Sequence, residues 1–193
     1  MTPTGVAADL YRYLQEARDN LLKSLDGLSE YDVRRPMTPS GTNLLGLVKH
    51  VTGVESGYLC ESVGRPAPVR LPWIEDDSVW DSADMWATAD QSREYIVGLY
   101  KEVWRYSDQS IAEVALDAPA EVQWWSQEKR HTTFGSVLVR VVAETAHHAG
   151  HADIVREMID GRGGKDHDDA GDQDWWKAYL IKIQTAADAH RAG

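Results

Sequence analysis

The sequence has few of the residues that several classes of protein require. Its single cysteine, Cys60, excludes an internal disulfide framework and any cysteine-rich zinc or iron–sulfur site. Basic residues are also scarce: 20 Lys and Arg stand against 31 Asp and Glu, which gives a formal charge of −11. Nucleic-acid binding depends on counterions that a basic surface displaces, so this charge predicts no nucleic-acid partner.

Long apolar segments and targeting signals are missing as well. No window approaches the roughly 18 uncharged apolar residues that a membrane span needs. Residues 1–10 have neither the basic region nor the apolar region of a secretory signal peptide. We therefore expect a cytoplasmic protein with no membrane partner, and one cysteine fits that reducing compartment. The apolar fraction of 42% supports a packed core, and 193 residues predict a single domain over 1–193.

The sequence shows no apolar–polar alternation of any length, the pattern that predicts β-strands. Apolar residues instead recur at three- and four-residue steps, which predicts amphipathic helices. Four main helices and a shorter fifth predict an all-α four-helix bundle with an extra C-terminal helix. The first follows the stripe from Leu10 to Leu28, and the others cover about residues 42–60, 82–115 (with a break near Ser107), 133–160 and 174–189.

Two connections between these helices are unusual. The segment 62–81 contains three prolines and is long for a compact domain, so we expect it to cross over one end of the bundle. Residues 161–174 are rich in Gly and Asp and predict a flexible acidic loop.

Phenylalanine is nearly absent, with Phe134 alone, whereas the sequence has 8 Trp and 8 Tyr. Trp73, Trp124 and Trp125 lie in the segments between the expected helices. Two interpretations remain open. These side chains cap the ends of the helical core, or they form a partly exposed aromatic rim around a substrate pocket.

The histidines are unevenly placed along the chain. His147, His148 and His151 cluster in the fourth main helix, and Glu144 lies one turn before His148. His50 lies in the second main helix. Helical residues three or four apart share a face, so pairs from this cluster can ligate one metal ion.

The apolar stripe of the fourth main helix distinguishes among these pairs. Each residue advances about 100° around a helix, and the stripe defines the direction of the core. Its members are Val137, Val141, Val155, Met158 and Ile159. On this scale Glu144 and His148 point toward the core. His151 lies at the margin of the core face, and His147 points toward the surface.

A carboxylate and an imidazole that point into a core need a partner, because buried charges are usually paired or metal-bound. His50 has a similar setting, since glycines on its helix face let another helix or a ligand approach closely. His50, Glu144 and His148 would form a two-histidine, one-carboxylate site with open coordination positions, which suits a catalytic divalent metal. A hydrogen-bonded polar cluster without metal explains the same pattern, so both interpretations remain open.

Two motifs carry a family resemblance that extends over nearly the whole chain. Thr42-Asn-Leu-Leu-Gly-Leu-Val-Lys-His50, followed by Glu55, resembles the second-helix motif of the DinB-like superfamily in its DUF664 branch. Glu144-Thr-Ala-His-His-Ala-Gly-His-Ala-Asp-Ile-Val-Arg-Glu157 resembles the fourth-helix motif of that branch. Leu71-Pro-Trp73 and the order of the segments are similar as well.

The resemblance implies a four-helix bundle with a long crossover connection and a divalent metal at one end of the core. The family's pattern has one ligand on the second helix and two ligands four residues apart on the fourth. Carried over, these ligands fall on His50, Glu144 and His148. His147 and His151 leave the register open, and His151 is expected to be a fourth ligand or a hydrogen-bond partner of a ligand.

Relatives with assigned activities are mostly thiol-dependent, among them mycothiol and bacillithiol S-transferases and a mycothiol-dependent maleylpyruvate isomerase. The resemblance therefore implies transfer of a low-molecular-weight thiol such as mycothiol to a small electrophile. Two alternatives remain: metal-assisted hydrolysis or isomerisation without a thiol, and a non-enzymatic metal-binding or stress-response bundle. Nitrogen and oxygen ligands suit zinc or nickel, and also iron or manganese. The resemblance further implies a homodimer.

Overall fold

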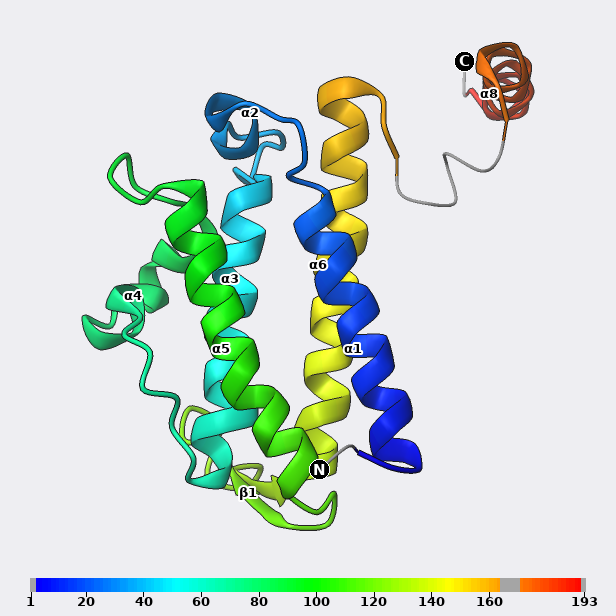
Figure 1. Ribbon diagram of the computed structural model, residues 1–193. Coiled ribbons are helices and arrows are strands. Elements are labelled where there is room, and N and C mark those ends of the chain that lie inside the picture. The colour runs from blue at the N-terminus through cyan, green and yellow to red at the C-terminus, as the bar shows by residue number, and fades with distance from the viewer. Residues whose placement is uncertain (1–2, 164–170, 192–193) are drawn as a thin grey trace.

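Four long helices lie side by side in the computed structural model, which describes residues 3–163 and 171–191 (Figure 1). They are α1 (Val6–Lys23), α3 (Leu44–Glu55), α5 (Arg93–Glu113) and α6 (Phe134–Asp160). Helix α1 packs against α6, and α3 packs against both α5 and α6. A short helix, α2 (Glu30–Arg34), connects α1 to α3 at one end of the bundle (Figure 1). The predicted all-α four-helix bundle is confirmed.

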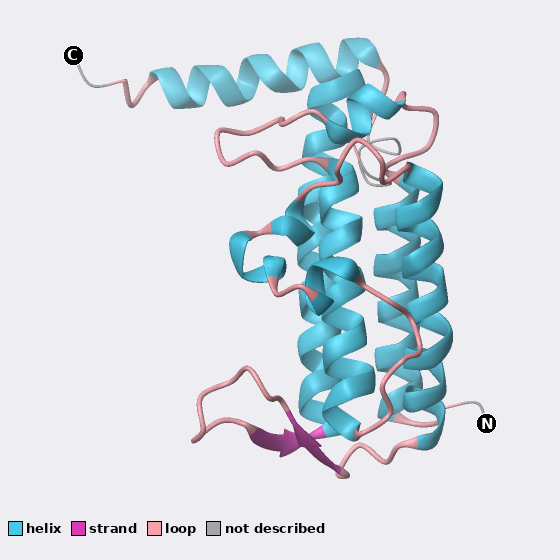
Figure 2. Ribbon diagram, turned by 90° about the vertical axis from the view of Figure 1, so that its left-hand side faces the viewer, coloured by secondary structure: helices cyan, strands magenta, loops and turns pink. Residues whose placement is uncertain are grey.

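The connection from α3 to α5 runs along the side of the bundle (Figure 2). It contains α4 (Pro72–Glu75) and 3₁₀ turns at Glu61–Val63, Ser78–Asp81 and Ala83–Met85. The sequence predicts that this long connection crosses over one end of the bundle. In the structure the connection instead packs against α3 and covers a face of that helix.

The expected boundaries of the third main helix were wrong. Helix α5 begins at Arg93 and not near residue 82, because the Ser92 side chain caps it by accepting from the Tyr95 backbone N–H at 3.1 Å. The helix then runs without a break to Glu113. The predicted break near Ser107 is absent because Ser107 is buried and its hydroxyl bonds within the bundle.

A small β-hairpin closes the end of the bundle opposite α2 (Figure 1). Strands β1 (Pro119–Glu121) and β2 (His131–Thr133) pair antiparallel, with Ala120 opposite Thr132. The sequence analysis predicted no strands here, because three residues are too few to show a period of two. Their connecting loop holds Trp124 and Trp125.

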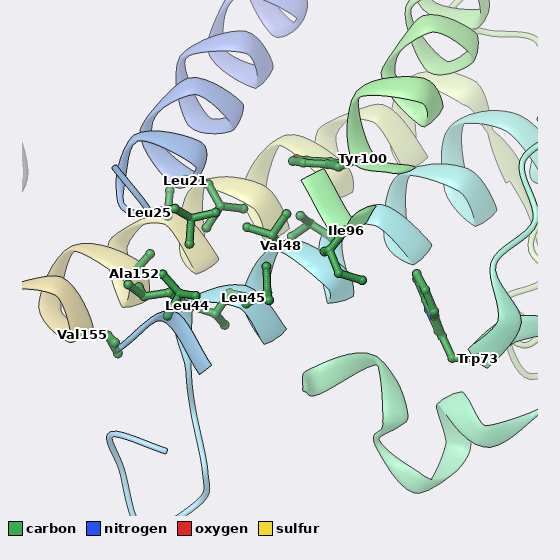
Figure 3. Packing of buried hydrophobic residues seen from close by; sticks show 14 of the residues in the cluster. Leu21, Leu25, Leu44, Leu45, Val48, Trp73, Ile96, Tyr100, Ala152 and Val155 are labelled. Atoms are coloured by element: carbon green, nitrogen blue, oxygen red, sulfur yellow. The ribbon is translucent and has the colours of Figure 1, made fainter. Parts of the chain in front are cut away.

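The core forms two clusters along the bundle. In the first, Leu44, Leu45 and Val48 of α3 pack with Leu21 of α1 and with Leu25, which follows the end of that helix (Figure 3). The second lies toward the hairpin and includes the only phenylalanine; its buried members are Leu14, Tyr58, Leu59, Ile111, Ala120, Val122, Phe134, Val137, Leu138 and Val141.

A buried ion network joins three helices between these clusters. Arg18 of α1 and Glu55 of α3 are fully buried, and the Nε of Arg18 donates to Oε1 of Glu55 at 3.0 Å. Nη1 of the same arginine donates to Asp108 of α5 at 2.7 Å. The α-helix of α3 ends at this glutamate and continues as a π-helical turn, Ser56–Cys60. Such turns are frequent at functional sites.

The predicted extra C-terminal helix is α8 (Gln173–Asp188), which extends away from the bundle (Figure 2). Half of the acidic loop predicted over residues 161–174, namely residues 164–170, lies outside the described residues. No helix among the described residues is long and apolar enough to cross a membrane.

Candidate metal centre

Three side chains from two helices meet on one side of the bundle. His50 comes from α3, and Glu144 and His148 come from successive turns of α6. Their ligand atoms all lie within 4.8 Å of one another. Oε1 of Glu144 is 3.5 Å from Nε2 of His50 and 3.4 Å from Nε2 of His148. The structure thus brings together the three residues that the sequence predicted as metal ligands.

The bundle positions these residues through ordinary helix geometry. Glu144 and His148 are four residues apart, so they share one face of α6. That face is inward, as the helical wheel predicted, although neither side chain is sealed from solvent: His148 is 15% exposed and Glu144 is 33% exposed. Packing of α3 against α6 places His50 opposite them, with the His50 and His148 rings edge to face at 4.8 Å.

Asp84 completes the group from the crossover connection. Its Oδ2 lies 2.7 Å from Nδ1 of His50. A carboxylate at Nδ1 keeps the proton on that nitrogen, so the lone pair of Nε2 points toward Glu144 and His148. Metal-binding histidines in proteins commonly have this partner. Sequence reasoning missed Asp84, because several acidic residues occur in this segment and none shows a helical period.

The crossover can approach α3 because of two features of that helix. A Cβ on Gly46 would lie 1.8 Å from the Met85 carbonyl oxygen, so only glycine fits there. One turn of helix away, Lys49 donates its ammonium hydrogens to the carbonyl oxygens of Ala83 and Trp86 at 2.6 and 2.9 Å. These contacts hold the chain on both sides of Asp84 against His50.

The charge state of the group suits a divalent cation. Burial, with the nearby His50, lowers the pKa of His148 to about 4, so its imidazole is neutral at pH 7. Burial alone would raise the pKa of Glu144, but His148 and His50 outweigh it and the pKa is lowered, which keeps the carboxylate ionised. Burial would lower the pKa of His50, but its hydrogen bond to the Asp84 carboxylate and the charge of that group raise it above 6.5. Two imidazoles and an ionised carboxylate are the donors that zinc and its neighbours bind.

The two remaining histidines of the cluster lie outside this group. His147 and His151 are both exposed, and their rings are 4.5 Å apart. Nδ1 of His151 is 3.5 Å from Nδ1 of His148. We expected His151 to be a fourth ligand or a hydrogen-bond partner of a ligand. Its contact with His148 fits the second role, because His151 is not among the residues whose ligand atoms lie within 4.8 Å of one another.

A cavity of about 280 Å³ opens beside the candidate ligands. His50 and Glu144 form one wall, and most of the rest is apolar. Its lining residues are His50, Gly53, Val54, Ser56, Gly57, Tyr58, Glu61, Ile74, Asp77, Val79, Trp80, Asp84, Trp124, Arg140 and Glu144. Apolar cavities with a few converging polar groups are typical of small-molecule sites.

Of the three tryptophans predicted to shape a pocket, one lines this cavity. Trp124 lies over Gly57, where a Cβ would be 2.7 Å from the indole ring. Trp125 lies beside it and bonds to Tyr58. Trp73 is instead buried in the core at 2% exposure, with its ring 4.7 Å from the Lys49 ammonium, so for this residue the core interpretation holds.

A model of the family described as mycothiol-S-transferase matches residues 9–161 of the chain. A solved structure titled as the conserved protein of a locus from Enterococcus faecalis has a similar fold, with a TM-score of 0.63. The two sequences are 11% identical, and the match covers 82% of this chain and 99% of that one. No curated protein matches the sequence.

Proposed function

Because the chain belongs to the mycothiol-S-transferase family, and so to the DinB-like superfamily, we propose that it is a metal-dependent enzyme that transfers mycothiol to a small electrophile. His50, Glu144 and His148 hold the metal in this proposal. The observation that carries it is the meeting of three ligand atoms within 4.8 Å of one another, where two of the three residues, His50 and Glu144, line a largely apolar cavity.

The donor set fits a catalytic divalent ion better than a structural one. Structural zinc sites have four protein ligands, whereas catalytic sites have three and an open position. We propose zinc or nickel; iron and manganese accept the same nitrogen and oxygen donors. When bound, such an ion lowers the pKa of a thiol that coordinates it and makes the sulfur nucleophilic at neutral pH.

The chain itself offers no nucleophilic sulfur at this site. Cys60 is buried in the π-helical turn and does not line the cavity. Burial, with the nearby carboxylate of Glu55, raises the pKa of its thiol to about 12, so it stays protonated at neutral pH. The reacting sulfur must therefore come from a small thiol, which agrees with the family.

The residues around the candidate ligands have separable tasks. Asp84 fixes the ring of His50 and so orients the lone pair of Nε2. Trp80, Trp124 and Ile74 provide apolar walls that can exclude water from a bound electrophile. In the reaction, the sulfur of mycothiol forms a bond to carbon of the electrophile, the bond from that carbon to the leaving group breaks, the leaving group departs with the bonding electron pair, and the thiol proton passes to solvent.

Metal content and conjugation activity test the proposal together. The wild-type protein should contain about one equivalent of a divalent metal, and His50→Ala and His148→Ala should both lose it. With metal bound, the wild type should conjugate mycothiol to 1-chloro-2,4-dinitrobenzene. Metal without conjugation of any thiol would favour the non-enzymatic bundle. If the protein converts a substrate at a rate that added thiol does not change, the hydrolase or isomerase is favoured.

We further propose that the protein belongs to the DUF664 branch and works in the cytoplasm as a homodimer. What supports a dimer is α8, whose Trp175, Leu180 and Ile183 are 43–59% exposed. Apolar side chains at this density on a helix usually meet a partner surface. Light scattering of the purified protein should give twice the chain mass of 21.6 kDa, and a mass of one chain would contradict the dimer.

A further inference from the structure

The hydroxyl of Tyr58 has an unusual set of partners. Its oxygen accepts two hydrogen bonds, from Nε1 of Trp124 at 3.2 Å and from Nε1 of Trp125 at 3.0 Å. Both lone pairs of the oxygen are therefore used, and the hydroxyl hydrogen remains to be donated. Among the described residues, none offers this hydrogen an acceptor within hydrogen-bond distance. Tyr58 is only 7% exposed and lines the cavity, so the natural acceptor is a ligand there.

Arg140 lines the same cavity and lies over the Tyr58 ring. It lies one turn before Glu144 on α6, and its Cζ is 5.1 Å from the Tyr58 ring centroid and 5.6 Å from that of Trp125. No carboxylate among the described residues lies within 4.0 Å of its guanidinium nitrogens. Arginines elsewhere in the bundle form ion pairs with carboxylates distant in the sequence, for example Arg18 with Glu55 and Arg93 with Glu30. Arg140 is exposed and thus presents a guanidinium without a direct ion pair at the open edge of the cavity, where its charge is felt by Glu144 one turn away.

We infer that Tyr58 and Arg140 bind a carboxylate of the electrophile, and that the substrate is a small apolar molecule with one such group. This inference rests on the proposed function, since it names the substrate class of that site. A guanidinium and a hydroxyl hydrogen both donate to carboxylate oxygens, and the guanidinium bond is charge-assisted. The carboxylate lies about one helical turn from Glu144, so the reacting carbon lies toward the metal ligands.

The rest of the lining defines the other properties of the substrate. Trp80 and Trp124 have flat faces that suit a planar or aromatic body. Glu61 and Asp77 also line the cavity and are exposed, so they form its outer rim. Their charges would repel a second anionic group at that rim. The site therefore selects a monoanion with its charge directed at Arg140.

A matched pair of electrophiles tests this selectivity. In 4-chloro-3-nitrobenzoate and 4-chloro-3-nitrobenzamide the same ring carbon reacts: the sulfur of mycothiol bonds to it, chloride leaves with the bonding electron pair, and the thiol proton goes to solvent. Each kcat/KM is divided by the rate constant without enzyme, which removes the difference in intrinsic reactivity. The wild type should prefer the carboxylate by about tenfold to hundredfold, the range for a hydrogen bond to a charged group.

Three variants assign the preference to its residues. Arg140→Gln should reduce the ratio of benzoate to benzamide toward one, mainly through KM for the benzoate. Arg140→Lys should restore part of the ratio, and Tyr58→Phe should lower it by less than Arg140→Gln. Arg12→Gln is the control, because Arg12 also lies over a tyrosine ring, at 4.2 Å from Tyr13, but on the outer surface of α1. An unselective wild type, or equal losses for both substrates in Arg140→Gln, would overturn the inference.

A binding measurement separates this inference from the proposed function. Calorimetry compares 3-nitrobenzoate and 3-nitrobenzamide, which cannot react, on zinc-loaded and metal-free protein. Tighter binding of the benzoate in both forms, abolished in Arg140→Gln, supports the inference even if no conjugation is ever seen. Benzoate binding that requires zinc and persists in Arg140→Gln would place the carboxylate on the metal and overturn it.

Discussion

His50 and Asp84 are 34 residues apart in the sequence and 2.7 Å apart in the structure, from Nδ1 to Oδ2. This contact joins the crossover connection to the candidate ligand of α3. It fixes which ring nitrogen is free to bind a metal, and it does so from an irregular segment outside the four long helices. The crossover is therefore part of the candidate site as well as a connection.

Removing the Asp84 carboxylate should weaken metal binding without removing a ligand. Asp84→Asn keeps the size of the side chain but loses the charge, and we expect zinc affinity to fall by about 10- to 100-fold. Competition with a chromogenic chelator measures the affinity. Asp81→Asn is the control, since Asp81 is an exposed acid in the same segment. Equal affinities in the two variants would show that Asp84 does not support His50.

The glycine under the crossover should not tolerate a methyl group. In Gly46→Ala the new Cβ would meet the Met85 carbonyl oxygen at 1.8 Å, so the crossover must move. We expect a loss of about 1–3 kcal/mol in the free energy of unfolding, measured by urea denaturation of the metal-free protein.

Gly98→Ala is the matched control for this change. Gly98 lies within α5, and its Cβ would meet nothing within 4 Å. Alanine there should stabilise the helix by up to about 1 kcal/mol. If the two alanine variants were equally stable, the close approach at Gly46 would not be real.

Removing one partner of the buried Arg18–Glu55 ion pair should lower the free energy of unfolding. Arg18→Met leaves the Glu55 carboxylate without its partner in a site with no solvent exposure. We expect a loss of about 3–5 kcal/mol. The double variant Arg18→Met/Glu55→Leu should recover much of it, because the fully buried carboxylate is then gone, and Asp108, the other partner of Arg18, is 30% exposed. A double variant that is less stable than Arg18→Met would contradict this account.

Cys60 should resist alkylation over the pH range in which ordinary thiols react. Burial, with Glu55, raises the pKa of its thiol from 9.0 to about 12, so the native protein holds the proton where the unfolded chain releases it. This contribution to stability is present below pH 9 and is lost as the pH rises toward 12. At pH 9, reaction with iodoacetamide should be at least about 100-fold slower than in urea. Equal rates would show an accessible thiol.

The predictable part of the site came from helical periodicity. Glu144 and His148 share a face four residues apart, and the apolar stripe of α6 shows that this face is inward. Asp84 could not be found in this way, because it lies in a 3₁₀ turn whose position depends on Gly46 and Lys49. A contact between an irregular segment and a helix leaves no period in the sequence.

The same limit explains the errors in the fold. The predicted start of α5 near residue 82 is too early, because Ser92 ends the crossover as the N-cap of the helix, and its capping bond depends on local backbone geometry that an apolar period does not show. The hairpin was missed because its strands have three residues each. Trp73 was assigned to a pocket because its segment has no period, and only tertiary packing shows that its ring belongs to the core.

The most direct test of the central claim is an absorption titration of the cobalt-loaded protein with mycothiol. A thiolate that coordinates cobalt gives a charge-transfer band in the near ultraviolet. The account predicts that this band grows to saturation at about one equivalent of bound thiol, and that it is absent with the disulfide form of mycothiol. If cobalt is bound by His50, Glu144 and His148 and no such band appears at saturating mycothiol, the claim that this site activates a thiol is contradicted.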